Sequence, residues 1–218
     1  MKPVRWTLLT DGSSDRVLLH PVRWLLTQIS ERPFEGTWAD LSYYNAHSQV
    51  GDRASASLSR RICESLHAFP CERLIVHRDA EGQPAGDRRR EIESAVAATE
   101  LTTPAVRLVP VRMTEAWLLI SECAIRHAAG NPSPRTPLPL PRISKLEKLP
   151  DPKSKPKELL RKASEFEGRR LKKFKSREAQ AVHRTAELIQ DFSPLRSLSA
   201  FRQLELDLTA ALDTNGWR

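Results

Sequence analysis

The sequence predicts an α/β protein with a parallel sheet flanked by helices, followed by a basic helical region. Three observations predict this fold. In residues 1–130, short apolar segments alternate with segments that have helical periodicity. Residues 131–142 then contain five prolines, and the rest of the chain holds all the excess of positive charge.

The predicted strands are short and apolar. Residues 4–10 are apolar and branched enough for a buried strand, and residues 73–77 (RLIVH) have the near-continuous apolar character of a strand covered on both faces. Two further strands are predicted at 38–44, where the pattern is weaker, and at 106–111. Because a helical segment follows each strand, the strands are expected to be parallel.

A helix is predicted after each strand. The Ser/Asp cluster that ends at Asp15 is expected to cap the first helix, and Pro21 is expected to kink it. The other helices predicted in this part of the chain span 50–69, 87–100 and 115–129.

The proline-rich segment marks the clearest boundary in the sequence. Five prolines in twelve positions exclude regular helix or sheet and favour an extended, stiff connection. We therefore divide the chain into an α/β domain (1–130), a proline-rich connection (131–150) and a basic helical region (151–218) that packs on the sheet domain. The helices predicted in the last region span 155–166, 176–190 and 195–212, with the basic run GRRLKKFK between the first two.

Composition sets the class of protein. The chain has 218 residues, of which 39% are hydrophobic and 28% charged, which suits a globular protein with its own core and argues against a membrane-spanning or wholly disordered one. No secretory signal is visible, and the three cysteines lack C-x-x-C spacing, so we expect a cytoplasmic protein without a disulfide framework or a cysteine-rich zinc site.

The positive charge is concentrated. Residues 1–130 hold 16 basic and 16 acidic side chains, whereas residues 131–218 hold 19 and 11, a difference that equals the net charge of +8. Such a concentration predicts binding to nucleic acid, although a solvated helix face or a mobile basic loop would have the same composition. The residues expected to contact nucleic acid are Lys153, Lys155, Lys157, Arg169, Arg170, Lys172, Lys173 and Lys175. The three lysines that follow the proline segment are equally consistent with an exposed turn, and the other five surround Phe174, a combination that single strands favour.

Acidic residues follow three of the predicted strands. Asp11 follows the first, Asp79 and Glu81 follow the third, and Glu115 begins the helix after the fourth. Because the carboxyl ends of parallel strands line one crevice, we expect these four carboxylates to converge, with Asp11, Asp79 and Glu81 holding Mg²⁺. Each acid alone would also fit a helix cap or a first-turn charge, so their joint location is what favours a metal site.

Two further residues near these acids have alternative interpretations. His77 shares its side of the strand with Asp79, where it would orient a carboxylate or contact phosphate, or else be a hydrogen-bonded core histidine. Trp117, which follows Glu115, fits packing better than base stacking.

Three segments resemble a known family. LLTDGSSDRVLL resembles the first motif of the TOPRIM fold, and LIVHRDAEG resembles the second. PVRMTEAWLL is similar to a segment of TOPRIM proteins of the overcoming-lysogenisation-defect (OLD) type, which are nucleases of bacterial defence systems. DPKSKPKELL and DFSPLRSLSAF resemble an uncharacterised bacterial TOPRIM-like family, so the likeness extends over nearly the whole chain.

This resemblance implies a TOPRIM-like, Rossmannoid sheet and a Mg²⁺- or Mn²⁺-dependent nuclease that hydrolyses DNA or RNA, as an effector of bacterial defence. By position, Asp79 and Glu81 match the metal-binding acid pair, and Glu115 matches a later glutamate of the nuclease subgroup. Asp11 stands where TOPRIM proteins normally have a glutamate that handles protons or metal. The implied catalytic set is therefore Asp11, Asp79, Glu81 and Glu115.

Aspartate at position 11 supports an alternative function. Its shorter side chain reaches a metal more readily than a leaving oxygen, so the chain would then be a catalytically weak, nucleic-acid-binding or regulatory subunit. The resemblance to defence nucleases implies that such a subunit would dock an ATP-binding-cassette-type ATPase encoded nearby. This chain has no G-x-x-x-x-G-K-[ST] loop, so it is not expected to be the ATPase itself. The choice between DNA and RNA and the oligomeric state, a homo-oligomer included, stay open.

Other activities of similar folds fit less well. A topoisomerase is disfavoured because the only tyrosines are the adjacent Tyr43 and Tyr44, and a primase because the chain has no zinc module. A receiver-like domain ranks last, since Arg112 stands where that fold needs a lysine.

Overall fold

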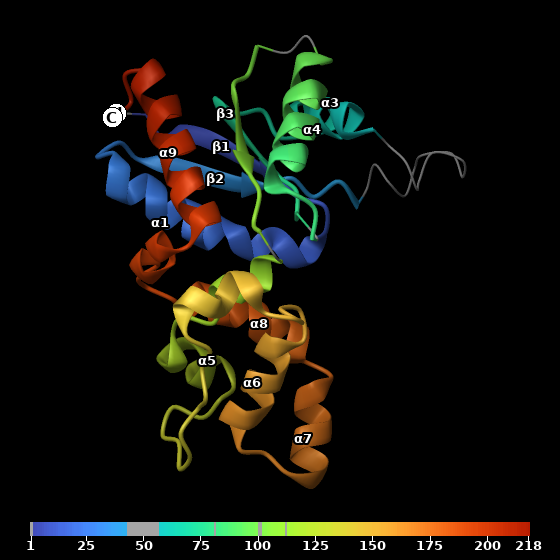
Figure 1. Cartoon of the computed structure of the whole chain (residues 1–218), viewed down its shortest axis with the longest axis vertical. Coiled ribbons are helices and arrows are strands. Elements are labelled where there is room, and N and C mark those ends of the chain that lie inside the picture. Colours follow the sequence, from blue (N-terminus) through green and yellow to red (C-terminus); the bar gives the residue numbers. More distant parts are fainter. Residues whose placement is uncertain (1, 43–56, 81, 100–101, 112) are drawn as a thin grey trace.

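The structure is a computed structural model that describes residues 2–42, 57–80, 82–99, 102–111 and 113–218. Its four strands form one parallel sheet in the order β2-β1-β3-β4 (Figure 1). The strands are β1 (Val4–Leu9), β2 (Phe34–Trp38), β3 (Arg73–His77) and β4 (Ala105–Leu108). The predicted α/β class, with a Rossmann-like parallel sheet between helices, is confirmed at this level.

The described helices follow the strands and then fill the second half of the chain. In the first half they are η1 (Ser13–Leu18), α1 (Leu19–Ile29), α3 (Leu58–Ala68), α4 (Ala85–Ala97), η2 (Thr114–Leu118) and α5 (Glu122–Ala128). In the second half they are η3 (Ile143–Lys148), α6 (Lys155–Ser164), α7 (Gly168–Lys175), α8 (Glu178–Leu188), η4 (Ser193–Ser197) and α9 (Ser199–Thr214).

Alternation along the strands builds a core on each face of the sheet. Leu8 and Ile75 belong to the cluster under α1 and α9, whereas Leu74 and Val76 belong to the cluster under α3 and α4. Both clusters are composed of side chains that are almost fully buried. The central strands are therefore covered on both sides, as their continuous apolar sequence predicted.

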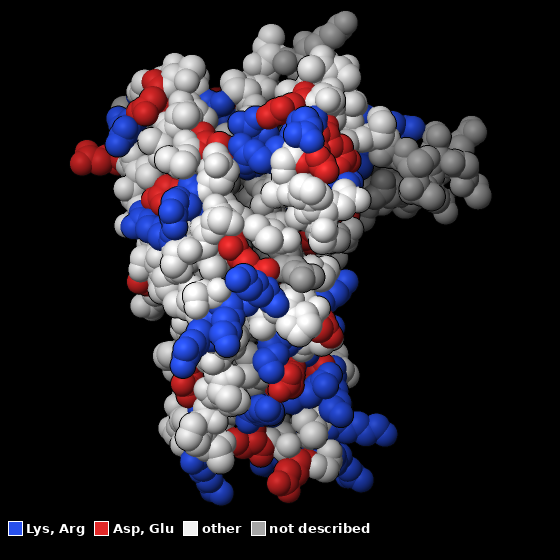
Figure 2. Space-filling model, in the orientation of Figure 1, with Lys and Arg blue, Asp and Glu red and all other residues white. Residues whose placement is uncertain are grey.

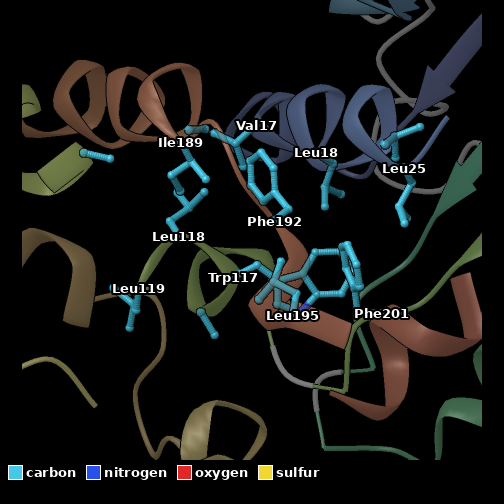
Figure 3. Close-up of a cluster of buried hydrophobic side chains, with 14 of the residues drawn as sticks. Val17, Leu18, Leu25, Trp117, Leu118, Leu119, Ile189, Phe192, Leu195 and Phe201 are labelled. Atoms are coloured by element: carbon cyan, nitrogen blue, oxygen red, sulfur yellow. The ribbon is translucent and has the colours of Figure 1, made fainter. Parts of the chain in front are cut away.

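The first of these clusters continues beyond the sheet into the helical part of the molecule. Figure 3 shows η1 and α1 packed around Phe192 and Phe201 from the second half of the chain. Trp117 is 3% exposed and meets Phe201 edge-on at a ring distance of 5.2 Å, which confirms that it is a packing residue. The sheet and the helices below it thus share one continuous core.

The helices α5 to α8 form a lobe beside the sheet. In this helical lobe, α6 contacts α5, α7 and α8, while α9 returns to the sheet and packs on β4 and α1 (Figure 1). Residues 131–142 contain neither helix nor strand, as their prolines predicted. None of the described helices has the length and apolar character needed to cross a membrane.

The observed elements differ from the predicted ones in several places. The fourth strand ends at Leu108 rather than at 111, and the helix predicted at 195–212 is divided into η4 and α9. The second strand is Phe34–Trp38 rather than 38–44, because this edge strand is only half-buried and so lacks a strong apolar pattern. The helix predicted at 115–129 is divided into η2 and α5. The basic run GRRLKKFK, expected to separate helices, is itself the helix α7.

Two further predictions extend beyond the described residues. The end of the strand predicted at 38–44 and the start of the helix predicted at 50–69 lie outside them. Tyr43, Tyr44 and Arg112 lie outside them as well.

Candidate metal centre at the switch point of the sheet

The order of the strands creates a crevice between β1 and β3. From β1 the chain passes to β2 on one side of the sheet, and β3 then pairs with β1 on the other side. The connections that leave the carboxyl ends of β1 and β3 therefore diverge, which is where open α/β sheets bind ligands. The residues just after these two strands therefore line the expected ligand-binding crevice.

Three buried side chains meet at this switch point. They are Asp15 in η1, His77 at the end of β3 and Asp79 two residues later, and one potential ligand atom of each lies within 4.8 Å of the others. His77 Nε2 is 3.2 Å from Asp79 Oδ1, and His77 Nδ1 is 3.9 Å from Asp15 Oδ2. The imidazole ring thus stands between the two carboxylates, with one nitrogen toward each.

The turn after β1 holds the Asp15 carboxylate in place. The Gly12 backbone N–H donates a hydrogen bond to Asp15 Oδ2 at 3.3 Å, and the Gly12 carbonyl accepts from the Asp15 N–H at the same distance. Thr10 Oγ1 donates to the Gly12 carbonyl at 2.8 Å and itself accepts from Trp38 Nε1 at 2.9 Å. The turn thus fixes the position of the Asp15 carboxylate through hydrogen bonds to the backbone and to side chains of neighbouring residues.

A third carboxylate, Glu115 in η2, lies beside this group. Burial raises the pKa of Glu115, the charges of Asp15 and Asp79 raise it further, and Lys153 lowers it. Burial also raises the pKa of Asp15, His77 lowers it, and Asp79 raises it. These mutual effects show that the three acids share one electrostatic environment.

Arginine and lysine form no close ion pair with these acids. Within the described part of the chain, the pairs of Asp15 and Asp79 are with His77 alone, and Glu115 forms none. Buried carboxylates are costly; His77 and Lys153 offset this cost in part, and a bound cation or a proton would compensate the rest. The arrangement is therefore typical of a site that binds a cation.

The donor atoms fit a divalent metal ion. His77 Nδ1 and Glu115 Oε2 are buried and have no hydrogen-bond partner among the described residues, so both are available to an ion or its waters. Two oxygens on one Mg²⁺ are at most about 4.2 Å apart, given bonds of about 2.1 Å. The three-residue group, within 4.8 Å, needs only a small contraction to reach that spacing.

Asp11 lies near the buried group, where its charge acts on Asp15, but it is not one of the three residues of that group. Asp11 Oδ1 accepts hydrogen bonds from Arg61 at 3.0 Å and from Arg78 at 2.7 Å, and Arg78 also pairs with Glu91 at 3.0 Å. Two guanidinium groups thus neutralise Asp11 at the rim of the crevice. Among the described residues, the buried group contains Asp15 where the motif pointed to Asp11.

Of the other three predicted acids, two are in the buried site and one lies outside the described residues. Asp79 and Glu115 are both in the buried site, as their positions after β3 and β4 led us to expect. Glu81 lies outside the described residues.

The predicted nucleic-acid-binding residues lie along the helical lobe. Lys153 is near enough to Glu115 to lower its pKa, and Lys157 and Lys175 are near enough to Glu178 to lower its pKa. Lys155 instead pairs with Glu158 at 2.9 Å in the first turn of α6. The remaining four, Arg169, Arg170, Lys172 and Lys173, are exposed on α7 and form no ion pair with a described carboxylate.

Asp15 is the site residue that the sequence analysis assigned only to a cap. A signal for it exists, because Asp15 is in phase with the buried Leu18 and Val22 of the same helical stretch. An acid on the apolar side of an amphipathic segment is unusual and points inward. His77 is buried and contacts Asp79 and Thr114, which is consistent both with a residue that orients a carboxylate and with a hydrogen-bonded core histidine.

Comparisons of the chain with protein families, with curated proteins and with solved structures find no match.

Proposed function

We propose that this protein is a divalent-metal-dependent nuclease that hydrolyses phosphodiester bonds of DNA or RNA. The observation that supports it best is the buried group of Asp15, His77 and Asp79, with Glu115 beside it, at the switch point of a parallel sheet. The basic helical lobe next to this group supports a polyanionic substrate.

The residues divide into those that would hold the metal and those that would act around it. Asp15 and Asp79 would bind Mg²⁺ or Mn²⁺, and His77 would orient Asp79 through Nε2 while offering Nδ1 as a further ligand. When bound, such an ion neutralises charge on the phosphodiester and makes water a better nucleophile. The imidazole favours Mn²⁺ over Mg²⁺, since Mg²⁺ takes oxygen ligands almost exclusively.

Glu115 and Lys153 are suited to contact the reacting phosphate and water. Glu115 is buried, and its raised pKa keeps a larger share of the carboxyl protonated than at the surface, so it exchanges protons more readily near neutral pH. Lys153 is exposed near it and carries a positive charge toward the site. We assign proton transfer to Glu115 and phosphate contact to Lys153.

The arginine contacts of Asp11 favour the alternative function. The Asp11 carboxylate is held by hydrogen bonds from Arg61 and Arg78 and is not free to approach a leaving oxygen, so a reaction that needs this side chain would be slow. The chain would then serve as a nucleic-acid-binding or regulatory subunit that docks an ATPase. The motif resemblance to OLD-type nucleases supports both this partner and a role in bacterial defence.

The test is cleavage by the purified protein of plasmid DNA, single-stranded DNA and total tRNA in Mg²⁺, in Mn²⁺ and in EDTA. We expect cleavage with either metal, more with Mn²⁺, none in EDTA, and none by Asp79→Asn, which keeps the side-chain shape but removes the charge. Asp11→Asn is the matched control and should retain cleavage. Activity that survives in Asp79→Asn would exclude this site, and no cleavage of any substrate would favour the regulatory alternative.

A further inference from the structure

The tip of the helical lobe carries a groove along α7, formed by α7 and the residues just before and after it. The groove encloses about 450 Å³, and its lining consists of Phe166, Arg170, Lys173, Phe174 and Arg177. The two phenylalanine rings meet at 5.9 Å and 76°, and both side chains are partly exposed. Aromatic surface is thus accessible between positively charged side chains.

The turn between α6 and α7 fixes the shape of this groove. Glu165 and Gly168 both have left-handed backbones, with φ of 51°, and they reverse the chain so that Phe166 faces α7. The Glu165 carboxylate accepts hydrogen bonds from the backbone N–H groups of Arg135 and Thr136 at 2.9 and 3.0 Å. The proline-rich connection therefore anchors the turn, and the groove is largely formed before any ligand binds.

α7 contributes little to the core of the protein. None of its residues is fully buried, it packs only lightly on α6, and Phe174 is partly buried against the main core cluster. Arg170, Lys173 and Arg177 form no ion pair with any described carboxylate, so their charges are available to a ligand. The basic sequence of α7 is therefore better explained by binding of a ligand than by a contribution to stability.

Basic side chains also lie near two buried acids, Glu178 in the helical lobe and Glu115 at the candidate metal centre. Lys175 of α7 and Lys157 of α6 both act electrostatically on Glu178, and Lys153 acts on Glu115. Figure 2 shows lysine and arginine side chains spread over the helical lobe, with acidic groups between them. A polyanion that reached the metal centre would therefore meet further positive charge in the direction of α7.

We infer that the groove of Phe166 and Phe174 binds unpaired bases of a single-stranded nucleic acid whose backbone follows these lysines toward the metal centre. Stacking needs an exposed base face, which a duplex hides, and the flanking cations bind the phosphates on either side. The inference deepens the proposed function by naming single strands as the substrate class. It concerns binding and is testable without cleavage.

The experiment measures binding of fluorescent oligonucleotides by anisotropy in EDTA, where no metal-dependent cleavage occurs. One probe is a single strand of mixed sequence, as DNA and as RNA, and the other is its duplex. Phe174→Leu keeps an apolar side chain but removes the ring face. Lys173→Gln removes a charge in the groove, and Lys172→Gln removes one from the same helix outside it.

We expect the wild type to bind the single strand more tightly than the duplex. Phe174→Leu should weaken single-strand binding at least about fivefold and leave duplex binding within about twofold, because one stacked base is worth about 1–3 kcal/mol. Lys173→Gln should weaken binding more than Lys172→Gln does. If Phe174→Leu fails to fold, as judged by circular dichroism, the two lysine variants still test the inference.

Several outcomes overturn the inference. They are equal affinity for single strand and duplex, equal effects of the two lysine variants, no binding at all, or tighter binding to vesicles of anionic lipid than to the oligonucleotide. Groove-dependent binding without metal-dependent cleavage would refute the proposed nuclease but not this inference, and cleavage without groove-dependent binding would refute only the inference.

Discussion

Replacing Asp15 by asparagine should stabilise the metal-free protein. The ligand oxygens of Asp15 and Asp79 lie within 4.8 Å of one another, and Asp15 is 5% exposed. At an effective dielectric constant of about 20, two full charges at that distance repel by about 3.5 kcal/mol. Burial of the Asp15 charge adds to this cost, whereas protonation and the nearby imidazole offset it, so we expect a net gain of about 1–2 kcal/mol in the free energy of unfolding.

The assay is thermal unfolding of the wild type and of Asp15→Asn in EDTA and in excess Mn²⁺. In EDTA the variant should melt about 2–8 °C higher, from about 2–4 °C per kcal/mol for a chain of this length. Mn²⁺ at about 100 times its dissociation constant should stabilise the wild type by about 2.7 kcal/mol, and it should leave the variant nearly unchanged.

Asp11→Asn is the matched control for this prediction. It removes a carboxylate of the same type from the same turn, but one that pairs with Arg61 and Arg78, so its loss should lower the melting temperature slightly or leave it unchanged. The reasoning is refuted if Asp15→Asn melts below the wild type in EDTA, or if both proteins gain equally from Mn²⁺.

Three further predictions follow from the same structure. The advantage of Asp15→Asn in EDTA should shrink in urea unfolding as pH falls from neutral toward 3.8, the ordinary pKa of aspartate. Burial raises the folded-state pKa of Asp15, so the wild type loses stability as pH rises through that raised pKa. Glu178→Gln should cost about 1–2 kcal/mol of stability at pH 7 in chemical denaturation, because it removes the charge-assisted hydrogen bonds from Arg161. This cost should vanish in acid: the hydrogen bonds from Arg161 lower the pKa of Glu178, so the wild type loses this stabilisation as pH falls through the lowered pKa. Gly36→Ala should lower stability by about 1–3 kcal/mol in thermal melts, because its Cβ would lie 2.1 Å from the buried Trp6 ring. An unchanged melting temperature would show that β1 and β2 move apart at this position without cost.

The parts of the fold that the sequence predicted well are those with a strong pattern. The third strand has its predicted bounds, Arg73–His77, because five buried residues in a row leave little ambiguity. The second strand was misplaced because Phe34–Trp38 lies at the edge of the sheet and alternates between half-buried and exposed positions. Gly36 there is explained only by a neighbour distant in sequence, the Trp6 ring, which local propensity does not reveal.

The candidate site was predictable in place but only partly in composition. Asp79 and Glu115 were expected because acids at the carboxyl ends of β3 and β4 must face one crevice. The choice between Asp11 and Asp15 depends on which carboxylate meets an arginine. Arg61 lies 50 residues from Asp11, so that contact is set by tertiary packing and is invisible to spacing arguments.

The shared core explains how distant segments combine into one site. Glu115 belongs to η2, whose Trp117 packs against Phe201 of α9. Because α9 in turn packs on β4, the position of Glu115 is fixed relative to the sheet. Lys153 follows η3, whose Leu146 is fully buried in the same cluster. Because both residues are fixed to one core, the metal centre and the basic lobe should move as a unit. A substrate of the proposed nuclease would then meet a preformed surface, and only a substrate with unpaired bases would reach the candidate metal centre.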